Sequence, residues 1–457
     1  MATGASPTRR VYLRTLGCPK NQIDSELMLG TLTRAGHEMV LDPSEADVLV
    51  VNTCAFIGPA KEESIDAILE AAHYKTARRG QRLVVTGCLA QRYADELQEA
   101  LPEVDVFVGT GDLGRIGEAV RPPTVDAPRV YRGAAHVLPP HASSPRVRTG
   151  AWWTTYLKVS EGCDHQCSFC IIPKIRGGHE SRPLEDLVDE AAALAADGVV
   201  ELNLIAQDLT AYGRDRDDGA SLARLVRALA RRVPTLGWLR LLYAYPTSVT
   251  DELLEVMADE PAVCDYLDMP LQHASDRILR AMRRPGQEAT RRLLQRVRAA
   301  VPRVALRSAF IVGFPGETGD DVRMLCDFLD EACFEHVGVF RYSQEEGTAA
   351  AGLPDGLPAD VVEARWEQVM AAQAAVSARR MRAQRGTEVM VLVESREADG
   401  TLVGRTERQA PEIDGVIRVH GDAALGTVVP VEVTNSTTYD LEGTIIVPAV
   451  DRTPIRP

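Results

Sequence analysis

The chain has 457 residues, of which 45% are apolar and 25% charged, and these proportions are typical of a globular protein of about three domains. Its formal net charge of −14 at pH 7 argues against a generic nucleic-acid-binding protein. No apolar run reaches the roughly 20 residues of a membrane span, and the N-terminus lacks the apolar core of a signal peptide, so we expect a cytoplasmic protein with no membrane partner.

The N-terminal part of the chain, residues 9–124, predicts a parallel α/β sheet. Short apolar runs rich in β-branched residues alternate there with helical patterns. The predicted strands are 11–16, 46–52 and 82–86, and two of the predicted helices are 21–35 and 60–78. A segment dense in Pro, Ala and Ser follows, and it predicts a linker at 125–150.

The central part, residues 151–380, shows a second alternation of strands and helices. The predicted strands are 154–160, 199–206, 238–243, 265–269, 304–312 and 336–342. The predicted helices are 184–197, 221–232, 249–259, 275–283, 289–300 and 319–332, and an alanine-rich helix follows at 358–384. Six such units fit a partial (β/α)6 barrel better than a complete barrel of eight units.

The tail, residues 383–449, changes to short strands separated by Gly and Asp turns, which predicts a small all-β barrel of OB type. From residue 383 to the last residue there are twelve Asp or Glu, seven Arg and no Lys, which gives a charge near −5, and the one aromatic residue is Tyr439. An RNA-binding barrel needs cations and aromatic platforms, so we expect no stable nucleic-acid binding. An acidic surface suits a basic partner, although it also serves solubility.

Three cysteines stand within eight positions of one segment, EGCDHQCSFCIIPKIRG, directly after the first barrel strand. They are Cys163, Cys167 and Cys170. Three thiolates on a tight loop can bind three corners of an iron–sulfur cluster and leave one iron open for chemistry. A zinc knuckle or a four-cysteine cluster completed by Cys264 is the alternative. His165 is a further candidate ligand, and a polar loop histidine is its simpler interpretation.

Three more cysteines each follow a predicted strand of the first sheet. They are Cys18, Cys54 and Cys88. Ligands of open parallel sheets bind beyond the carboxyl ends of the strands, so these thiols are placed to converge on a second metal centre with an open iron. Burial in the core is the alternative for each cysteine alone. We interpret Cys264, Cys326 and Cys333 as packing residues.

The spacing Cys-x3-Cys-x2-Cys after the first barrel strand resembles the signature of the radical S-adenosylmethionine (SAM) superfamily. The resemblance implies that the amino and carboxylate groups of SAM chelate the open iron. It also implies that one electron from the cluster cleaves SAM to a deoxyadenosyl radical.

Several residues are candidates for SAM contacts. Phe169 matches the aromatic position near the adenine, and RSAFIVGFPGET (307–318) resembles the later motif for the adenosyl part. Within that motif, Gly313 and Gly316 would allow close backbone approach, with an ordinary strand-to-helix turn as the alternative. Gln207 and Asp208 end the second barrel strand, where barrel sites lie, and are further candidates.

The combination of the scattered cysteine triad, the barrel and the β-barrel tail resembles the methylthiotransferases, whose tail is a TRAM-type domain. The resemblance implies a second 4Fe–4S cluster on Cys18, Cys54 and Cys88 that carries or accepts a sulfur. One SAM then methylates this sulfur, and another supplies the radical that removes hydrogen from an unactivated carbon, which couples to the methylthio group. We expect a flavodoxin or ferredoxin as electron donor, and we assign no catalytic residue beyond the cluster ligands.

Branches of this family modify either an adenosine of transfer RNA or an aspartate of a ribosomal protein. Four stretches resemble the second branch: CDHQCSFCIIPKIRG, LDMPLQHASDRIL, GVFRYSQEEGTAA and APEIDG. The resemblance therefore implies transfer of a methylthio group to the β-carbon of an aspartate in small-subunit ribosomal protein twelve, free or within its subunit. The alternatives are a transfer-RNA adenosine methylthiotransferase and, from another class, an iron–sulfur electron carrier without substrate.

Overall fold

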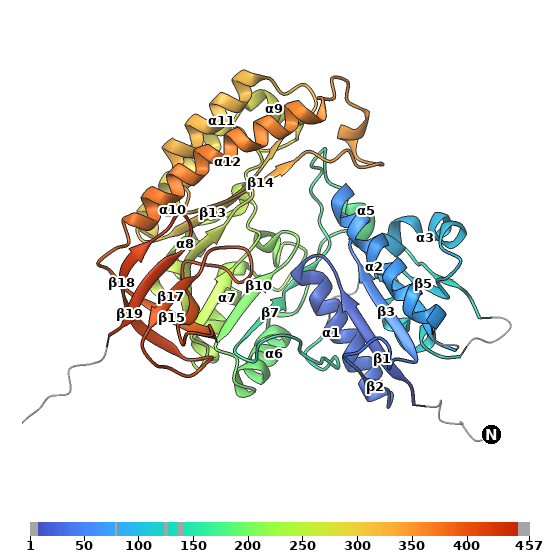
Figure 1. Cartoon of the computed structure of the whole chain (residues 1–457). Helices are drawn as coiled ribbons and strands as arrows, with labels where there is room; N and C mark the ends of the chain where they lie inside the picture. Colours follow the sequence, from blue (N-terminus) through green and yellow to red (C-terminus); the bar gives the residue numbers. More distant parts are fainter. Residues whose placement is uncertain (1–7, 78–79, 123–126, 136–139, 447–457) are drawn as a thin grey trace, which may run out of the picture.

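The computed structural model describes residues 8–77, 80–122, 127–135 and 140–446. It forms two six-stranded sheets and a small closed barrel, with the first sheet and the closed barrel flanking the central sheet (Figure 1). This arrangement confirms the predicted mixed α/β class with a C-terminal all-β barrel.

The first sheet has six parallel strands in the order β2-β1-β3-β4-β5-β6. The strands are β1 (Arg10–Thr15), β2 (Glu38–Met39), β3 (Val48–Thr53), β4 (Arg82–Gly87), β5 (Val106–Val108) and β6 (Val130–Tyr131). The helices of this part are α1 (Pro19–Arg34), α2 (Gly58–Ala77), α3 (Cys88–Ala100), η1 (Thr110–Arg115) and α4 (Ile116–Ala119). Strands β3 and β4 are buried along their whole length, as expected at the centre of a parallel sheet.

The three predicted strands and both predicted helices of this part are confirmed, whereas β2, β5 and β6 were not expected. Each of these has only two or three residues, which is too short to produce a periodic signal. Strand β6 lies inside the segment predicted as a linker, so part of that segment completes the sheet. Residues 125–126 and 136–139 of the predicted linker lie outside the described residues.

The rest of the predicted linker, residues 140–150, is fixed against α1. A Cβ at Gly30 would lie 2.3 Å from the backbone of Pro145, so the two chains touch where the helix has no side chain. Arg146 forms a 2.7 Å ion pair with the buried Glu26, and Thr149 donates its backbone N–H and its hydroxyl to the same carboxylate. These contacts make the segment part of the domain interface.

The central sheet also has six parallel strands, in the order β14-β13-β12-β11-β10-β7, which confirms the partial barrel. The strands are β7 (Thr154–Lys158), β10 (Glu201–Ile205), β11 (Trp238–Leu241), β12 (Val263–Asp268), β13 (Ala305–Val312) and β14 (His336–Arg341). The outer helices are α6 (Leu184–Ala196), α7 (Leu222–Arg232), α8 (Asp251–Asp259), α9 (Asp276–Ala281), α10 (Gln287–Ala300) and α11 (Gly319–Ala332). Shorter elements are β8 (Ser160–Glu161), α5 (Ile172–Arg176), β9 (Glu180–Ser181), η2 (Leu209–Ala211), η3 (Pro246–Ser248) and η4 (Ala349–Gly352).

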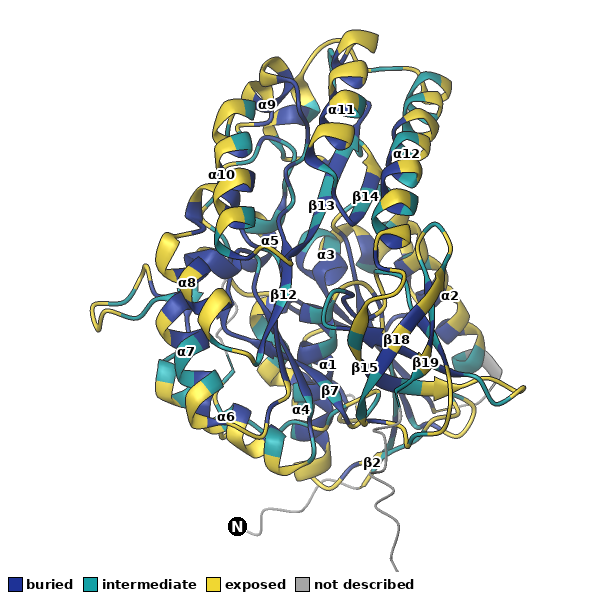
Figure 2. Ribbon diagram, turned by 90° about the vertical axis from the view of Figure 1, so that its left-hand side faces the viewer, coloured by how far each residue is buried: buried dark blue, intermediate teal, exposed yellow. Residues whose placement is uncertain are grey.

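The last part of the chain is a long helix, α12 (Ala359–Arg382), followed by a closed five-stranded barrel in the order β15-β16-β17-β19-β18. The strands are β15 (Glu388–Arg396), β16 (Leu402–Thr406), β17 (Ile417–His420), β18 (Val428–Ser436) and β19 (Leu441–Ile445). Helix α12 packs along α11 and β14, and Figure 2 shows buried inner and exposed outer faces on these helices. None of the helices in the described part of the chain is long and apolar enough to cross a membrane.

A buried ion cluster joins the closed barrel to the central sheet. Glu201, the first residue of β10, accepts hydrogen bonds from Arg240 of β11 at 2.9 Å and from Arg405 of β16 at 2.5 Å. All three side chains are at most 2% exposed. Because a buried carboxylate is stable only when paired, Glu201 fixes the position of β16 against the central sheet.

We expect Glu201→Ala to lower the free energy of unfolding by about 3–5 kcal/mol, because it leaves the buried Arg240 without its carboxylate. The matched control is Glu331→Ala, which removes an exposed partner of Arg291 and costs about 0–1 kcal/mol. Urea unfolding of both variants measures the difference. Equal losses would show that the Glu201 cluster does not hold the closed barrel in place.

Candidate functional site

The barrel cysteines lie on one loop between β8 and α5. Gly162 begins this loop with φ +72°, and a Cβ there would lie 1.8 Å from the carbonyl oxygen of Gly178, so only glycine fits. The sulfur of Cys163 accepts the backbone N–H of His165, and that of Cys170 accepts the N–H of Ile172. Such N–H···S contacts stabilise thiolates.

The three scattered cysteines meet at the carboxyl edge of the first sheet. Cys18 is the N-cap residue of α1, Cys54 follows β3, and Cys88 begins α3. A Cβ at Gly17, the neighbour of Cys18, would lie 3.1 Å from the sulfur of Cys54. After burial, Cys54 and Cys18 are among the groups that raise the pKa of Cys88, so the three thiols are close enough to influence one another's ionisation.

Asn21 organises this edge. Its side-chain amide donates to the backbone carbonyls of Leu16 and Thr53, at 2.9 and 3.0 Å, which fixes the chain just before Cys18 and just before Cys54. Its carbonyl oxygen lies 3.8 Å from the sulfur of Cys88. One side chain therefore sets the relative positions of all three thiols.

Both cysteine sets fit an iron–sulfur cluster by the chemistry of their donors. All nine cysteines are free thiols, and each set offers three sulfurs and no competing disulfide. Burial raises the pKa of Cys88 to about 12 and that of Cys170 to about 12, so these thiols need a bound cation to ionise. In the described residues no group of His, Cys, Asp and Glu is arranged for a single metal ion. That finding concerns a single metal ion, whereas an iron–sulfur cluster would bind one thiolate at each of several irons.

A buried network of four charges joins the first domain to the two elements that flank the barrel cysteine loop, β8 and α5. Lys158 of β7 forms ion pairs with Asp24 of α1 at 2.6 Å and with Glu161 of β8 at 2.7 Å. Arg176 of α5 pairs with the same two carboxylates, at 2.8 and 3.1 Å. All four side chains are at most 3% exposed. Two cations and two anions make the network neutral, as a buried ion cluster must be.

The network contacts Cys88 of the first-domain cysteine set and includes Glu161, which begins the segment that leads to the barrel set. The guanidinium of Arg176 lies 3.8 Å from the sulfur of Cys88 and donates to Asn21 at 2.6 Å. Glu161 stands two residues before Cys163 and accepts a hydrogen bond from Gln207. Burial opposes ionisation of Glu161, but Lys158 and Arg176 outweigh it and lower the pKa of this carboxyl to about 2. The first domain and the barrel are thereby held in one fixed relation.

Other residues around the barrel loop have clear partners. His165 stacks on Tyr245 with ring centroids 3.7 Å apart, and its Nε2 lies 2.7 Å from the carboxylate of Asp208. Asp208 also accepts the backbone N–H of Thr210, so both of its oxygens are in use. These contacts agree with His165 as a polar loop residue. Cys264 lies near the start of β12 beside Arg240, among core residues, which agrees with a packing role.

The predicted SAM residues occupy different environments. Phe169 packs against an apolar cluster that includes Phe314, and Gln207 is bonded to Glu161. Gly313 has φ +79°, and a Cβ there would lie 2.7 Å from both methyl groups of Val362 on α12. A Cβ at Gly316 would meet nothing closer than 3.7 Å. The structure therefore explains Gly313 by helix packing, whereas the role of all four in binding SAM stays a prediction.

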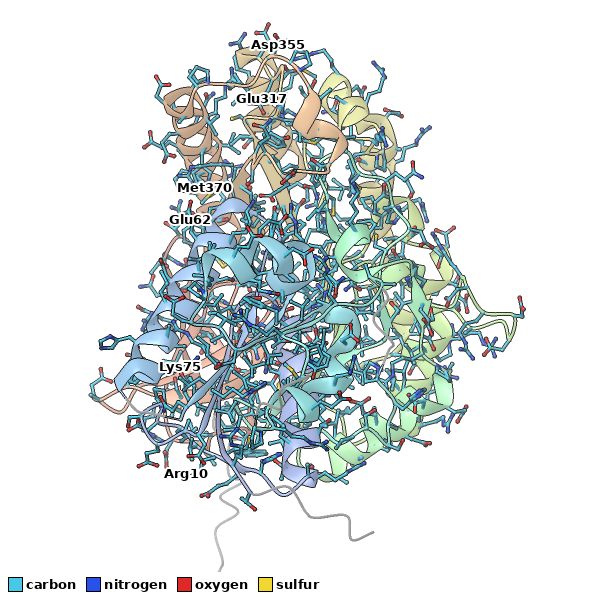
Figure 3. The ribbon with its side chains drawn as sticks, turned by 90° about the vertical axis from the view of Figure 1, so that its right-hand side faces the viewer. Arg10, Glu62, Lys75, Glu317, Asp355 and Met370 are labelled. Carbon is cyan, nitrogen blue, oxygen red and sulfur yellow. The ribbon has the colours of Figure 1, made fainter. Side chains whose placement is uncertain are left out.

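Glu317 stabilises the turn that contains both glycines. Its carboxylate accepts the backbone N–H of Gly313 at 3.1 Å and pairs with Arg365 of α12 at 2.7 Å. Figure 3 labels Glu317 near the end of the molecule that carries this turn. The turn, β13 and α12 therefore form one connected unit.

Lys20 is a further buried cation at the contact between α1 of the first domain and the barrel, which we call the junction. It lies on the first turn of α1, two residues after Cys18, and its ammonium is 3.0 Å from the centre of the Tyr243 ring. Burial lowers the pKa of Lys20 to about 8, although nearby Cys18 acts in the opposite direction. Tyr243 itself follows β11 with φ +67°, an unusual conformation for a large residue.

Sequence reasoning missed Lys20 and the four network residues because charged residues on a helix or near a loop indicate solvent exposure. Part of the signal was present in the segment CPKNQIDSE, in which Lys20, Asn21, Asp24 and Ser25 share one face of α1 at intervals of three and four. The structure buries this polar face, including Lys20, Asn21 and Asp24. Only a partner surface with matching charges explains such a helix.

Family models match all three parts of the chain. The model described as "Uncharacterized protein family UPF0004" matches residues 10–109, that of the "Radical SAM superfamily" matches 157–329, and that of the "TRAM domain" matches 386–446. The solved structure of the radical SAM methyltransferase TsrM from Kitasatospora setae shares the fold, with a TM-score of 0.54 and 18% identity over 73% of this chain and 75% of that chain. The fold and the three-cysteine loop thus define a radical SAM enzyme.

Curated relatives narrow this class. The ribosomal protein uS12 methylthiotransferase RimO of Anaeromyxobacter sp. (strain K) is 51% identical over 448 residues, which cover 96% of this chain and 93% of that protein. RimO of Myxococcus xanthus is 47% identical over 447 residues, which cover 96% and 92% of the two chains. The chain belongs to the RimO family of radical SAM methylthiotransferases.

We expect Gly313→Ala to lower the free energy of unfolding by about 2–4 kcal/mol, because it combines a strained φ with a clash against the stiff side chain of Val362. Gly316→Ala adds only the strained φ and costs about 1 kcal/mol. Urea unfolding compares the two, and adding Val362→Ala to Gly313→Ala should restore part of the loss. Equal losses for the two glycines would contradict the packing explanation.

Proposed function

We propose that this enzyme transfers a methylthio group to the β-carbon of an aspartate in ribosomal protein uS12, using two 4Fe–4S clusters and two molecules of SAM. The names of its relatives support the protein substrate. The observation that carries the two-cluster proposal is the buried network, in which Arg176 contacts Cys88 on one side and Glu161, next to the Cys163 loop, on the other. Two sets of three thiols are thereby held across one junction.

We assign a different role to each of the two cysteine sets. Cys163, Cys167 and Cys170 would hold the cluster that supplies the electron for SAM cleavage. The second set, Cys18, Cys54 and Cys88, would hold the cluster that supplies the sulfur. Arg176 donates its N–H toward the Cys88 sulfur. Asn21 joins the chain at Leu16 to that at Thr53 and contacts the Cys88 sulfur. An inert carbon–hydrogen bond demands a radical, so both ends must serve one enclosed site.

A transfer-RNA substrate is the weaker alternative. The described part of the tail forms a closed barrel, and the whole tail has a charge near −5 and a single aromatic residue, Tyr439, which is exposed. A nucleic-acid surface would use cations along the phosphate backbone and aromatic rings for the bases. The acidic barrel is better suited to a basic ribosomal protein. Membership of a methylthiotransferase family sets aside an electron carrier without substrate.

We infer a flavodoxin- or ferredoxin-type electron donor, since one-electron cleavage of SAM needs a low-potential source. The proposed substrate is uS12, free or carried on its ribosomal subunit, and we place the enzyme in the cytoplasm with it. The domain limits that accompany this proposal are 9–124, 151–380 and 383–449, of which residues 123–124 and 447–449 lie outside the described residues.

When the anaerobically reconstituted enzyme, SAM and a reductant meet both candidate substrates, we expect uS12 to gain the mass of one methylthio group on an aspartate. Transfer RNA should gain none, because the enzyme offers it no basic surface on the tail. Mass spectrometry of both substrates measures the outcome. Modified transfer RNA beside unchanged uS12 would overturn the proposed substrate in favour of the adenosine-modifying alternative.

Replacement of Cys18, Cys54 and Cys88 by Ala should halve the iron content and leave SAM cleavage measurable, because the barrel cluster is retained. Replacement of Cys163, Cys167 and Cys170 should abolish SAM cleavage. Iron analysis and deoxyadenosine formation measure the two effects. Cys333→Ala is the control, since this cysteine belongs to neither set. Unchanged iron in the first triple variant would remove the second cluster.

A further inference from the structure

We propose that Lys20 binds the side-chain carboxylate of the target aspartate and so places its β-carbon between the two cysteine sets. This inference rests on the proposed function, since it concerns the same substrate. It assigns a specificity-determining role to a residue that is not a cluster ligand.

Lys20 has the right position for this role. The first turn of α1 brings it to the junction between Cys18 and the barrel, and its ammonium lies 3.0 Å from the centre of the Tyr243 ring. Tyr243 comes from the carboxyl end of β11, the end at which barrel sites are built. Two residues further along the chain, Tyr245 stacks on His165 of the barrel cysteine loop, so the segment that carries Tyr243 also contacts that loop.

Lys20 is also the cation at this junction that lacks a counter-ion among the described residues. Lys158 and Arg176 share Asp24 and Glu161 in a network that is already neutral. The remaining nearby carboxylate, Asp268, pairs with Arg307 at 3.0 Å.

The ammonium of Lys20, in a residue only 7% exposed, has an aromatic ring as its contact and no carboxylate of the described chain within ion-pair distance. A buried cation of this kind is expensive unless an anion joins it. The aspartate side chain would supply that anion.

The backbone at Tyr243 supports this assignment. Its φ of +67° is a strained conformation for a tyrosine, and the structure maintains it through a 3.1 Å hydrogen bond from its backbone N–H to Asp268. Strain of this kind persists where the surrounding structure requires a side chain in one place. Here the result is that the ring lies under the ammonium, which orients Lys20 by a cation–π contact.

The chemistry of the target explains why a cation is useful. The reacting β-carbon is bonded directly to the carboxyl carbon, so a charge-assisted hydrogen bond to the carboxylate fixes the carbon that loses its hydrogen. Asparagine has nearly the same shape but no charge, and the site would reject it. A neutral adenine would gain nothing from the ammonium.

The competing explanation is that Lys20 only balances the charge of thiolates near Cys18. The two explanations predict different measurements. A charge-balancing role changes the auxiliary cluster itself, in iron content or in its electron paramagnetic resonance (EPR) spectrum. A substrate role leaves both unchanged and alters the discrimination between aspartate and asparagine in the substrate.

The test compares Lys20→Met, Lys20→Arg and a matched control, Lys75→Met. Lys75, labelled in Figure 3, lies in the last turn of α2 and pairs with Asp105, so it has its own counter-ion outside the buried network. Binding of a uS12 peptide, with either Asp or Asn at the target position, is measured on the reconstituted enzyme with SAM and without reductant. Iron content and the EPR spectrum of the reduced clusters are recorded for each variant.

We expect the wild type and Lys75→Met to bind the Asp peptide at least tenfold more tightly than the Asn peptide. Lys20→Met should bind both peptides equally, with normal iron and EPR spectrum, and Lys20→Arg should keep part of the preference. Undiminished preference in Lys20→Met, or an altered auxiliary cluster, would overturn the inference. Failure of the wild type to modify uS12 would instead overturn the proposed function.

Discussion

The neutral network of Asp24, Lys158, Glu161 and Arg176 is the constraint on which the rest of the site depends. Each of these charges would be unstable alone in a buried position, and their mutual pairing at 2.6 to 3.1 Å is what allows them to be buried together. The pairing requires α1 of the first domain to meet β7, β8 and α5 of the barrel in one orientation. The cysteine sets on the two sides of the junction take their relative position from it.

Helix α1 is the element that transmits this constraint. Its N-cap residue is Cys18, its first turn holds Lys20 and Asn21, and its next turn holds Asp24. The proposed cluster ligand Cys18, the proposed substrate contact Lys20, and the buried residues Asn21 and Asp24 therefore belong to one rigid element. On the other side of the helix, the segment 140–150 crosses at Gly30 and pairs Arg146 with Glu26, so the helix is fixed from both sides.

Much of the fold was predictable from the sequence, for physical reasons that also explain the failures. The strands 48–53 and 82–87 are buried on both faces, so their apolar runs were unmistakable, and the cysteines beyond them marked the functional edge. Strands of two residues, such as β6, exist because a neighbour pairs with them and leave no local pattern. The Pro- and Ser-rich segment indicated a linker because the residue that it packs against, Gly30, lies more than a hundred positions earlier in the sequence.

In the site, too, some residues could be predicted from the sequence and others could not. Thiols in a fixed spacing are specific enough to identify from sequence, because few other structures need them. The burial of Lys20, Asp24 and Arg176 could not be predicted from the sequence. Each would be an ordinary surface charge on an isolated helix, and only the contacts of the folded chain bury it. Gly313 is a related case: its motif suggested a ligand contact, and the contact that the structure shows is Val362 of α12.

The proposed reaction depends most directly on two clusters, one on each side of this network. Anomalous diffraction at the iron edge, measured on crystals of the anaerobically reconstituted protein, tests it. We predict two iron peaks, one within the thiols of Cys163, Cys167 and Cys170 and the other within those of Cys18, Cys54 and Cys88, with Arg176 and Lys20 between them. A single peak at the barrel loop, with the first-domain thiols free of iron, would contradict the account.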